Sequence, residues 1–405
     1  MSYGNGCLVQ TGNLPNYTIL SEIGKGTYGC VYEAIDQRDG GRVAMKKVLP
    51  KGEREGFPIT AIREIKTLKF LKHENILDLY DVVYQSPQSS SEKVSVYMVF
   101  PFIKHDLVGI QHFRRYRFYV SEIKCIILQV LKGLEYLHGK NVVHRDLKLA
   151  NLLIDGDGVV KIADFGLARI QLPKRLDQTN KVVTRWYRSP ELLLGATKYD
   201  YSVDMWSIGA ILGELVVGAP LFPGESEVHV LRFIFDTLGP PSEELWNGLY
   251  GYIDSPGMLG SVAETRKQLS DYIQFPTGVC QYDSRPERPI NLLIGDGDRN
   301  YLDRRVFKRL FMSVSLAGQM LIASLLQYDP CRRASAKTCH NDAFFTQDPM
   351  ASDPKSIVLS PESRRELHVK EGIPLINTIP QRSKWKERQR LNHVAPPNNK
   401  KQRKA

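Results

Sequence analysis

The strongest constraint on this chain is a pair of polar motifs. Residues 144–151 read His-Arg-Asp-Leu-Lys-Leu-Ala-Asn, and an Asp-Phe-Gly tripeptide begins at Asp164. On one loop, Asp146 can act as a base, Lys148 can contact a phosphate, and Asn151 can ligate magnesium. Asp164 adds a second hard oxygen ligand for that ion. The tripeptide alone is common by chance, but both motifs at this separation predict a site for nucleotide phosphates and magnesium.

The composition is typical of a soluble globular protein. The 405 residues are 42% hydrophobic and 24% charged, which leaves room for two packed lobes. No run approaches the roughly 18 apolar residues of a membrane span, and the first 14 residues lack the pattern of a secretory signal. We therefore expect no contact with a membrane. The six cysteines show no zinc spacing, so we expect reduced thiols in a cytosolic or nuclear protein.

The positive charge is concentrated at the C-terminal end. Residues 381–405 carry +8 of the formal net charge of +11, and they include a Pro-Pro-Asn-Asn run that opposes regular structure. Such a segment can be a solvated, disordered end. It can equally be recognised by a nuclear import receptor or contact nucleic acid. Residues 346–405 are expected to leave the folded domain as an extended tail.

The hydrophobic pattern predicts an α+β protein with two lobes. Residues 17–103 alternate apolar and polar positions, as in a small β-rich lobe. One helix is predicted within this lobe, with an apolar stripe at Ile62, Ile65, Leu68 and Leu71. Residues 104–345 form the larger second lobe. From about residue 121 onward the pattern is helical, with one stripe at Ile123, Ile126, Ile127, Val130, Leu131, Leu134 and Leu137 and a second apolar helical stretch at 204–218. Residues 1–16 form a short extension, and 250–300 show no clear period and are predicted to be an insertion.

A glycine-rich segment at residues 23–31 reads Ile-Gly-Lys-Gly-Thr-Tyr-Gly-Cys-Val. Glycines let a backbone approach phosphates without a Cβ in the way. The same pattern occurs in dinucleotide sites, where a helix follows it. Here the β-prone residues Val31 and Tyr32 follow instead, so we predict a strand–turn–strand flap over nucleotide phosphates.

Lys46 lies in a β-prone run behind this predicted flap. A lysine within an apolar strand needs a counter-charge, and Glu64 on the predicted helix 60–71 is the expected partner. Lys46 would hold the α- and β-phosphates as a point charge. Because strand side chains alternate between faces, Lys47 is expected to be exposed to solvent.

Three segments together resemble one family. Residues 58–64 (Pro-Ile-Thr-Ala-Ile-Arg-Glu) resemble the PSTAIRE-type helix by which cyclin-dependent protein kinases engage a cyclin. Residues 184–191 (Thr-Arg-Trp-Tyr-Arg-Ser-Pro-Glu) and 204–209 (Asp-Met-Trp-Ser-Ile-Gly) resemble the same family, which belongs to the CMGC group of Ser/Thr kinases. The resemblance covers residues 17–345.

This resemblance implies a bilobal kinase that uses ATP and Mg²⁺ and needs a cyclin. The chain alone is then expected to be nearly inactive, because the cyclin must press helix 60–71 inward to form the Lys46–Glu64 ion pair. The departures are Leu-Ala at 149–150, after the catalytic lysine, and Ser189, which stands where Ala is usual.

The family also implies which residues form the nucleotide site. Phe100 matches the gatekeeper, Pro101 to Ile103 the adenine-binding hinge, and Asp106 the ribose edge. The full predicted set is Ile23, Gly24, Lys25, Gly26, Thr27, Tyr28, Gly29, Cys30, Val31, Ala44, Lys46, Phe100, Phe102, Ile103, Asp106 and Leu153. Thr27 and Tyr28 also match inhibitory phosphorylation sites of some relatives, although both can be ordinary loop residues.

The resemblance further implies a phosphorylation switch and a substrate preference. Thr179 matches the activating phosphosite, which another kinase would modify. The arginines expected to bind that phosphate are Arg63, Arg145 and Arg169. A pocket for a substrate proline, which has no N–H to leave unpaired, is implied at Val182, Val183 and Arg188. Glu191 is expected to form a structural ion pair with Arg333.

Within the family, residues 55–60 and 97–102 look most like the fungal elongation-type kinase that phosphorylates the C-terminal repeats of RNA polymerase II. That likeness predicts a transcriptional role in the nucleus, with the cytoplasm as a second location. The alternatives are a cell-cycle member and a member that activates other kinases. A mitogen-activated kinase would have Thr-x-Tyr where Thr-Asn-Lys stands at 179–181. A non-catalytic scaffold would be expected to have lost Lys46, Asp146, Asn151 or Asp164, and all four are present.

Overall fold

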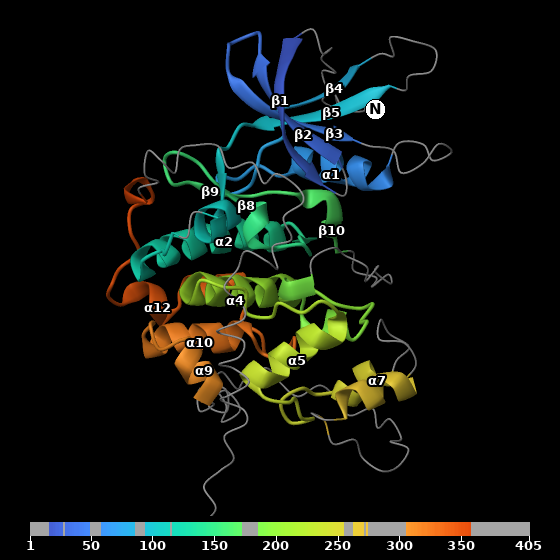
Figure 1. The fold of residues 1–405 in the computed structure, drawn as a ribbon, viewed down its shortest axis with the longest axis vertical. Coiled ribbons are helices and arrows are strands. Elements are labelled where there is room, and N and C mark those ends of the chain that lie inside the picture. The colour runs from blue at the N-terminus through green and yellow to red at the C-terminus, as the bar shows by residue number, and fades with distance from the viewer. Residues whose placement is uncertain are drawn as a thin grey trace, which may run out of the picture.

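The computed structural model describes residues 16–26, 29–48, 58–85, 94–113, 116–171, 185–254, 262–270, 273 and 305–357. A β-sheet with one helix beneath it forms the N-terminal lobe, and stacked helices form the larger C-terminal lobe (Figure 1). The predicted α+β bilobal architecture is therefore confirmed. None of the described helices is both long enough and apolar enough to cross a membrane.

The N-terminal lobe is built on a five-stranded antiparallel sheet. Its strands pair in the order β1-β2-β3-β5-β4. Their bounds are Tyr17–Gly26 (β1), Gly29–Asp36 (β2), Arg42–Val48 (β3), Asp81–Gln85 (β4) and Ser95–Pro101 (β5). The glycine-rich segment forms the end of β1 and the start of β2, which pair in antiparallel register. The two predicted strands are thus present, and the residues that join them, 27–28, lie outside the described residues.

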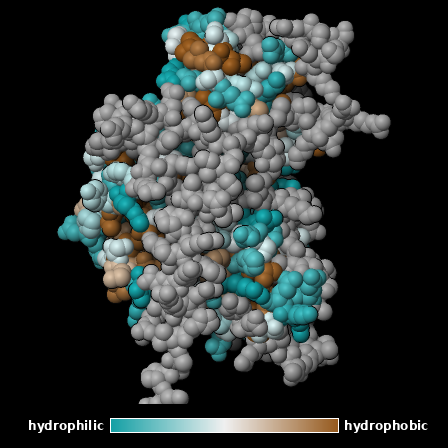
Figure 2. All heavy atoms as spheres, in the orientation of Figure 1, coloured by the Kyte–Doolittle hydropathy of each residue, from teal (hydrophilic) through white to brown (hydrophobic). Residues whose placement is uncertain are grey.

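The outer face of this sheet carries its own small apolar cluster. Tyr17, Ala34, Met45 and Val99 are among its buried members. Exposed apolar side chains also occur in β1, and Figure 2 shows hydrophobic surface beside hydrophilic surface over this lobe. The opposite face of the sheet packs toward the C-terminal lobe, because Val48, Met98 and Phe100 belong to the core cluster that extends into that lobe.

Helix α1 (Ile59–Phe70) follows Pro58, whose fixed φ suits a helix start. Its buried residues are Ala61, Glu64, Thr67 and Leu68. The predicted apolar stripe is therefore wrong in part, because Ile62 is 39% exposed whereas Glu64 is 4% exposed. The helix turns the charged Glu64 toward the sheet, since Glu64 meets the partly buried Lys46 of β3 there.

The C-terminal lobe packs around α2 (Val120–Gly139) and α4 (Ser202–Val217). Every residue of the predicted stripe on α2 is buried. Around these two helices lie α3 (Pro190–Leu193), α5 (Glu227–Leu238), α6 (Leu249–Ile253), α7 (Val262–Leu269), α9 (Arg305–Leu310), α10 (Leu316–Leu325), α11 (Ala336–His340) and α12 (Ala343–Thr346). Most of the predicted insertion at 250–300 lies outside the described residues.

Short strands hold the loops between the lobes. One sheet joins β6 (His105–Asp106), β8 (Leu152–Ile154) and β9 (Val160–Ile162). A second pair joins β7 (Val142–Val143) to β10 (Arg169–Ile170). These pairings fix the two polar motifs of the sequence, because each motif lies between strands of these small sheets.

Residues 347–357, called the C-terminal strap, pack against the C-terminal lobe. Lys124 of α2 donates a hydrogen bond to the Gln347 carbonyl at 2.6 Å, and the Ser352 amide donates to the Ser121 carbonyl at 3.0 Å. Ile357 is 4% exposed. The prediction that the chain leaves the domain at residue 346 is therefore wrong for the strap, whose few apolar residues gave no periodic signal. Residues 358–405, with the basic tail, lie outside the described residues.

The predicted ion pair between Glu191 and Arg333 is present and fully buried. Two hydrogen bonds of 2.8 and 3.1 Å join the guanidinium to the carboxylate, and Arg333 also donates to the Ser202 and Gln327 carbonyls. The side chains are 1% and 0% exposed. This pair links the start of α3 to the chain that precedes α11.

Replacing Glu191 by Gln should destabilise the chain by about 3–5 kcal/mol, because it leaves the Arg333 charge buried without its carboxylate. Chemical denaturation measures this loss. Lys72→Gln is the matched control, since it breaks the exposed Lys72–Asp78 pair and should cost less than about 1 kcal/mol. Equal losses in the two variants would contradict this assignment.

Candidate active site

The inner face of the sheet collects the predicted nucleotide-binding side chains. In the antiparallel register, Val31 lies opposite Lys46, and Ala44 lies opposite Phe100. Opposed residues, and those two apart on one strand, share a face. Gly24 is paired with Val31 and has no heavy atom within 4 Å of the position a Cβ would take. The sheet therefore places an apolar surface, one lysine and an open glycine backbone on one side.

Lys46 joins two carboxylates from different parts of the chain. Its Nζ lies 2.8 Å from Oε1 of Glu64 on α1 and 3.1 Å from Oδ1 of Asp164. Burial alone would lower the pKa of Lys46, but the Asp164 and Glu64 carboxylates outweigh it and raise that pKa. Burial likewise acts to raise the pKa of Asp164, and the Lys46 charge brings it below its ordinary value. Burial raises the pKa of Glu64 in spite of the Lys46 charge. The pKa shifts of Lys46 and Asp164 therefore favour their charged forms, whereas that of Glu64 favours its neutral form.

The Lys46–Glu64 pair forms in the single chain. The sequence-based expectation that a cyclin must first press α1 inward is thus not met by this structure. Helix α1 already lies against the 3₁₀ turn Phe165–Leu167. Lys46 contacts Asp164 as well as Glu64, so this lysine joins α1 to the segment that follows β9.

Two neighbours of these residues differ from their predicted settings. Lys47 is half-buried rather than exposed, because its ammonium lies 5.7 Å from the centre of the Tyr97 ring. Cys30 is paired with Lys47 across β2 and β3, so its side chain is on the outer face of the sheet. Only the backbone of Cys30 can therefore face a nucleotide.

The catalytic loop brings Asp146, Lys148 and Asn151 together. Lys148 Nζ lies 2.7 Å from Asp146 Oδ2, and Asn151 Nδ2 donates to the Asp146 carbonyl at 2.8 Å. A 3₁₀ turn at Leu149–Asn151 brings the asparagine back toward the aspartate. Leu149, part of one of the two departures from the family pattern, is fully buried.

Asp204 at the start of α4 anchors the catalytic loop by accepting hydrogen bonds from its backbone. The sequence did not reveal this role. The Asp204 carboxylate accepts hydrogen bonds from the His144 amide at 2.9 Å and the Arg145 amide at 2.8 Å, and it lies 3.0 Å from His138 Nε2. Burial acts to raise the pKa of Asp204, but the bonds from His138 and Arg145 lower it overall. Arg145 has a positive φ of 71°, so the anchor helps to hold a strained backbone.

The predicted hinge and ribose edge lie at the junction of the lobes. Phe100 is 6% exposed, and Phe102, Ile103 and Leu153 are half-buried. The Asp106 carboxylate accepts a hydrogen bond from the Gly109 amide at 2.8 Å. Burial raises its pKa despite that bond.

The donor set of this site fits a magnesium ion. Asn151 commits its amide nitrogen to Asp146, which leaves its oxygen available as a ligand. Asp164 supplies a carboxylate that is 34% exposed. Magnesium prefers such oxygen donors and few protein ligands. No group of three or more His, Cys, Asp or Glu side chains suited to a metal occurs in the described ranges.

The three predicted phosphate-binding arginines are close enough to interact. Burial lowers the pKa of Arg169, and repulsion from the Arg145 and Arg63 charges lowers it further. Arg145 also donates hydrogen bonds to the Leu167 carbonyl and the Tyr199 hydroxyl, at 2.6 and 2.7 Å. A cluster of three cations is a suitable setting for an anion.

Several predicted site residues lie outside the described part of the chain. They are Thr27, Tyr28, Thr179, Val182 and Val183. Lys25, Gly26 and Gly29 are described only as backbone within β1 and β2. Arg188, the remaining member of the predicted proline pocket, is 6% exposed and lies 3.8 Å from Glu227.

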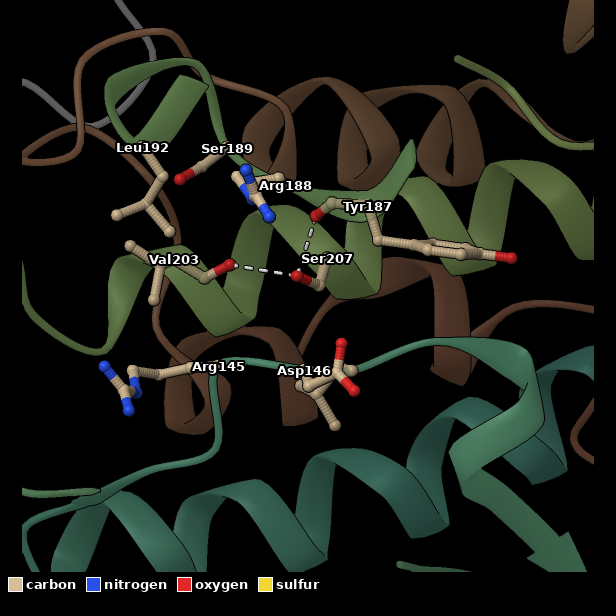
Figure 3. A pocket seen from close by; sticks show the side chains of 9 residues that line it. Arg145, Asp146, Tyr187, Arg188, Ser189, Leu192, Val203 and Ser207 are labelled. Carbon is tan, nitrogen blue, oxygen red and sulfur yellow. Dashed lines mark hydrogen bonds between the residues drawn. The ribbon is translucent and has the colours of Figure 1, made fainter. Parts of the chain in front are cut away.

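A cavity lies beside the catalytic loop (Figure 3). It is lined by residues 145–147 of the loop, by residues 187–189, and by Leu192, Val203 and Ser207. The Asp146 side chain thus borders both the candidate active site and this cavity.

Replacing Asp204 by Asn should cost about 2–3 kcal/mol at pH 7, because charge-assisted hydrogen bonds to the loop are lost. The folded pKa of Asp204 is below its unfolded value of about 3.9, so its contribution is complete above that value and disappears as the pH falls through the folded pKa. Unfolding free energies should therefore differ between wild type and variant at pH 6–8 and converge below about pH 4. An unchanged gap at low pH, or an equal effect of Asp39→Asn at an exposed carboxylate, would contradict this role.

The sequence was compared with protein families and with known proteins. The protein kinase domain family matches residues 17–345. Cyclin-dependent kinase C-1 of Arabidopsis thaliana is 38% identical over 92% of this chain and 68% of its own length. Cyclin-dependent kinase 10 of Homo sapiens is 38% identical over 86% of this chain and 84% of its own length. Serine/threonine-protein kinase bur1 of Emericella nidulans is 44% identical over 61% of this chain, a match that spans about half of that relative (47%). The chain therefore belongs to the ATP-dependent protein kinases, in the cyclin-dependent kinase family.

Proposed function

We propose that this chain transfers the γ-phosphoryl group of ATP to serine or threonine residues that precede proline. The observation that carries the proposal is the joint placement of two charged groups of residues. Lys46 contacts both Glu64 and Asp164, and Asp146 contacts Lys148. A non-catalytic scaffold would have no need for this complete set of buried and partly buried charges, whose assembly costs desolvation energy.

In the proposed mechanism, Asp146 orients the substrate hydroxyl and accepts its proton. The hydroxyl oxygen bonds to the γ-phosphorus while the bond from that phosphorus to the β–γ bridging oxygen breaks, and ADP leaves. Lys148 neutralises charge on the transferred group, and Lys46 holds the α- and β-phosphates. Asn151 and Asp164 would hold magnesium, which neutralises phosphate charge when bound. Positioning and charge neutralisation supply most of the rate enhancement.

The exposed side of α1 supports a cyclin as the partner. Ile59 is 71% exposed, Ile62 39% and Phe70 55%. Apolar side chains gathered on one exposed helix are typical of an interaction surface. Because the Lys46–Glu64 pair already forms in the single chain, we propose that the cyclin holds α1 in place rather than creating the pair.

Phosphorylation of Thr179 by another kinase is the proposed activation step. A phosphate carries about −1.5 to −2 charges, and Arg63, Arg145 and Arg169 form a cluster whose mutual repulsion it would relieve. One phosphate would then join α1, the catalytic loop and the segment after Asp-Phe-Gly. Full activity of a Thr179→Ala variant would contradict this switch.

The proline preference is assigned to Val182, Val183 and Arg188. A substrate proline has no N–H to leave unpaired at such a site. Arg188 is supported by its burial and by its position beside the cavity that Asp146 also lines.

The proposed substrates are the C-terminal repeats of RNA polymerase II, phosphorylated in the nucleus during transcription. The likeness of residues 55–60 and 97–102 to the fungal elongation-type kinase motivates this proposal. The basic residues 381–405 are proposed to bind an import receptor or nucleic acid. Nucleic-acid binding that weakens steeply with salt, and is lost when 381–405 are deleted, would favour the second role.

The test is ATP-dependent labelling of a heptad-repeat peptide by the full chain, purified with the cyclin that accompanies it. Labelling should require the cyclin, and Asp146→Asn should lower kcat by roughly 10²–10⁴-fold, because the group that accepts the proton is lost. Asp157→Asn, in the exposed turn between β8 and β9, is the matched control and should leave kcat unchanged.

Two peptide substrates distinguish the kinase activity from the proposed choice of substrate. Labelling of a generic Ser-Pro peptide without labelling of the heptads would retain the kinase and reject the transcriptional assignment. Labelling that survives Asp146→Asn would reject the proposed mechanism.

A further inference from the structure

Ser189 has an unusual setting for a serine hydroxyl. The residue is fully buried, and among the described residues its Oγ has no hydrogen-bond partner. It occupies the N-cap position of α3, yet its side chain makes no capping bond to that helix. A buried hydroxyl without a partner costs about 1–3 kcal/mol, so a serine is a poor choice here unless something binds it.

The cavity beside the catalytic loop offers such a binding position. Ser189 lines it together with Ser207, and the space is sufficient for a single water molecule (Figure 3). Ser207 Oγ donates to the Tyr187 carbonyl at 2.9 Å and to the Val203 carbonyl at 3.2 Å. Its proton is thereby committed, and its oxygen can only accept from a further partner.

We propose that this cavity binds one ordered water molecule, held by Ser189 Oγ and Ser207 Oγ, and that Ser189 thereby acts as a positioning residue. The water would donate to Ser207 and bond to Ser189, which adds a second link between residues 187–189 and α4 beside the direct Ser207–Tyr187 hydrogen bond. Those residues carry Arg188 and form the wall of the cavity opposite Asp146.

A water fits the surrounding charges better than an anion. The Asp146 carboxylate lines the same cavity and would repel an anion. Two donor groups of the Arg145 guanidinium, Nε and Nη1, are occupied by the Leu167 carbonyl and the Tyr199 hydroxyl. Arg188 lies 3.8 Å from the Glu227 carboxylate.

The direction of the change in Tm caused by Ser189→Ala tests whether the water is present, and this test does not depend on kinase activity. If Ser189 Oγ has no partner, Ser189→Ala removes a buried polar group and should raise Tm or leave it unchanged. If it holds a water, the same change should lower Tm by about 2 °C in the full chain. Ser202→Ala is the matched control, because Ser202 Oγ is also buried without a partner among the described residues and does not line the cavity. Alanine is usual at position 189 in the family, so the variant should fold.

A kinetic measurement tests the positioning role, which rests on the proposed kinase function. Ser189→Ala should raise KM for a Ser-Pro peptide by roughly two- to ten-fold with kcat nearly unchanged, because the substrate-binding segment loses a support while Asp146 keeps its contacts. An unchanged KM would overturn the positioning role. If no peptide is phosphorylated at all, the kinase proposal fails, and the Tm comparison still decides whether the water is present.

A crystal structure of the full chain with its cyclin identifies the occupant. We expect one peak within hydrogen-bond distance of both serine oxygens, absent in Ser189→Ala. A wild-type cavity without that peak, or a peak unchanged in the variant, would overturn the proposal. Crystals grown in bromide provide the second arm, since an anomalous peak at this position would identify an anion instead of water.

Discussion

The contact of one lysine with two carboxylates organises this molecule. Lys46 comes from the central strand of the N-terminal sheet, Glu64 from α1, and Asp164 from the segment that follows β9. Each of these charges would be costly to bury alone, so the sheet, the helix and the segment stabilise one another's positions. The side of α1 that faces the sheet is therefore partly polar, while apolar side chains such as Ile59 are exposed on the helix.

A second buried carboxylate, Asp204, organises the C-terminal lobe. Asp204 lies on the buried helix α4, accepts hydrogen bonds from two backbone amides of the catalytic loop, and contacts His138. The loop that carries Asp146 is thereby attached to the most buried helix of the lobe. With the N-terminal sheet holding Lys46 and α4 holding the catalytic loop, the groups proposed to act on ATP are positioned by rigid elements rather than by mobile loops.

Much of this arrangement could be predicted from the sequence, because the spacing of apolar residues indicates helices and strands. The stripe on α2, the hairpin at the glycine-rich segment and the Lys46–Glu64 pair each follow from local pattern and charge. The apolar period predicted that Ile62 would be buried on α1. The structure buries Glu64 instead, because its ion pair with Lys46 decides which side of the helix faces the sheet. Lys47 lies on the predicted face of its strand, but its contact with the Tyr97 ring, which the sequence did not reveal, covers part of it. Cys30 shares this outer face because the strand register pairs it with Lys47. The strap, the anchoring role of Asp204 and the burial of Ser189 depend on contacts between distant segments, which no local pattern reports.

The most direct test of this account is a double-mutant cycle on Lys46 and Glu64, measured as the free energy of unfolding of the full chain without a cyclin. Lys46→Met, Glu64→Gln and the double variant are compared with wild type. A pair already formed in the single chain predicts an interaction energy of about 1–3 kcal/mol. Losses that add within about 0.5 kcal/mol would show that the two residues do not interact until a partner binds, and would contradict the account.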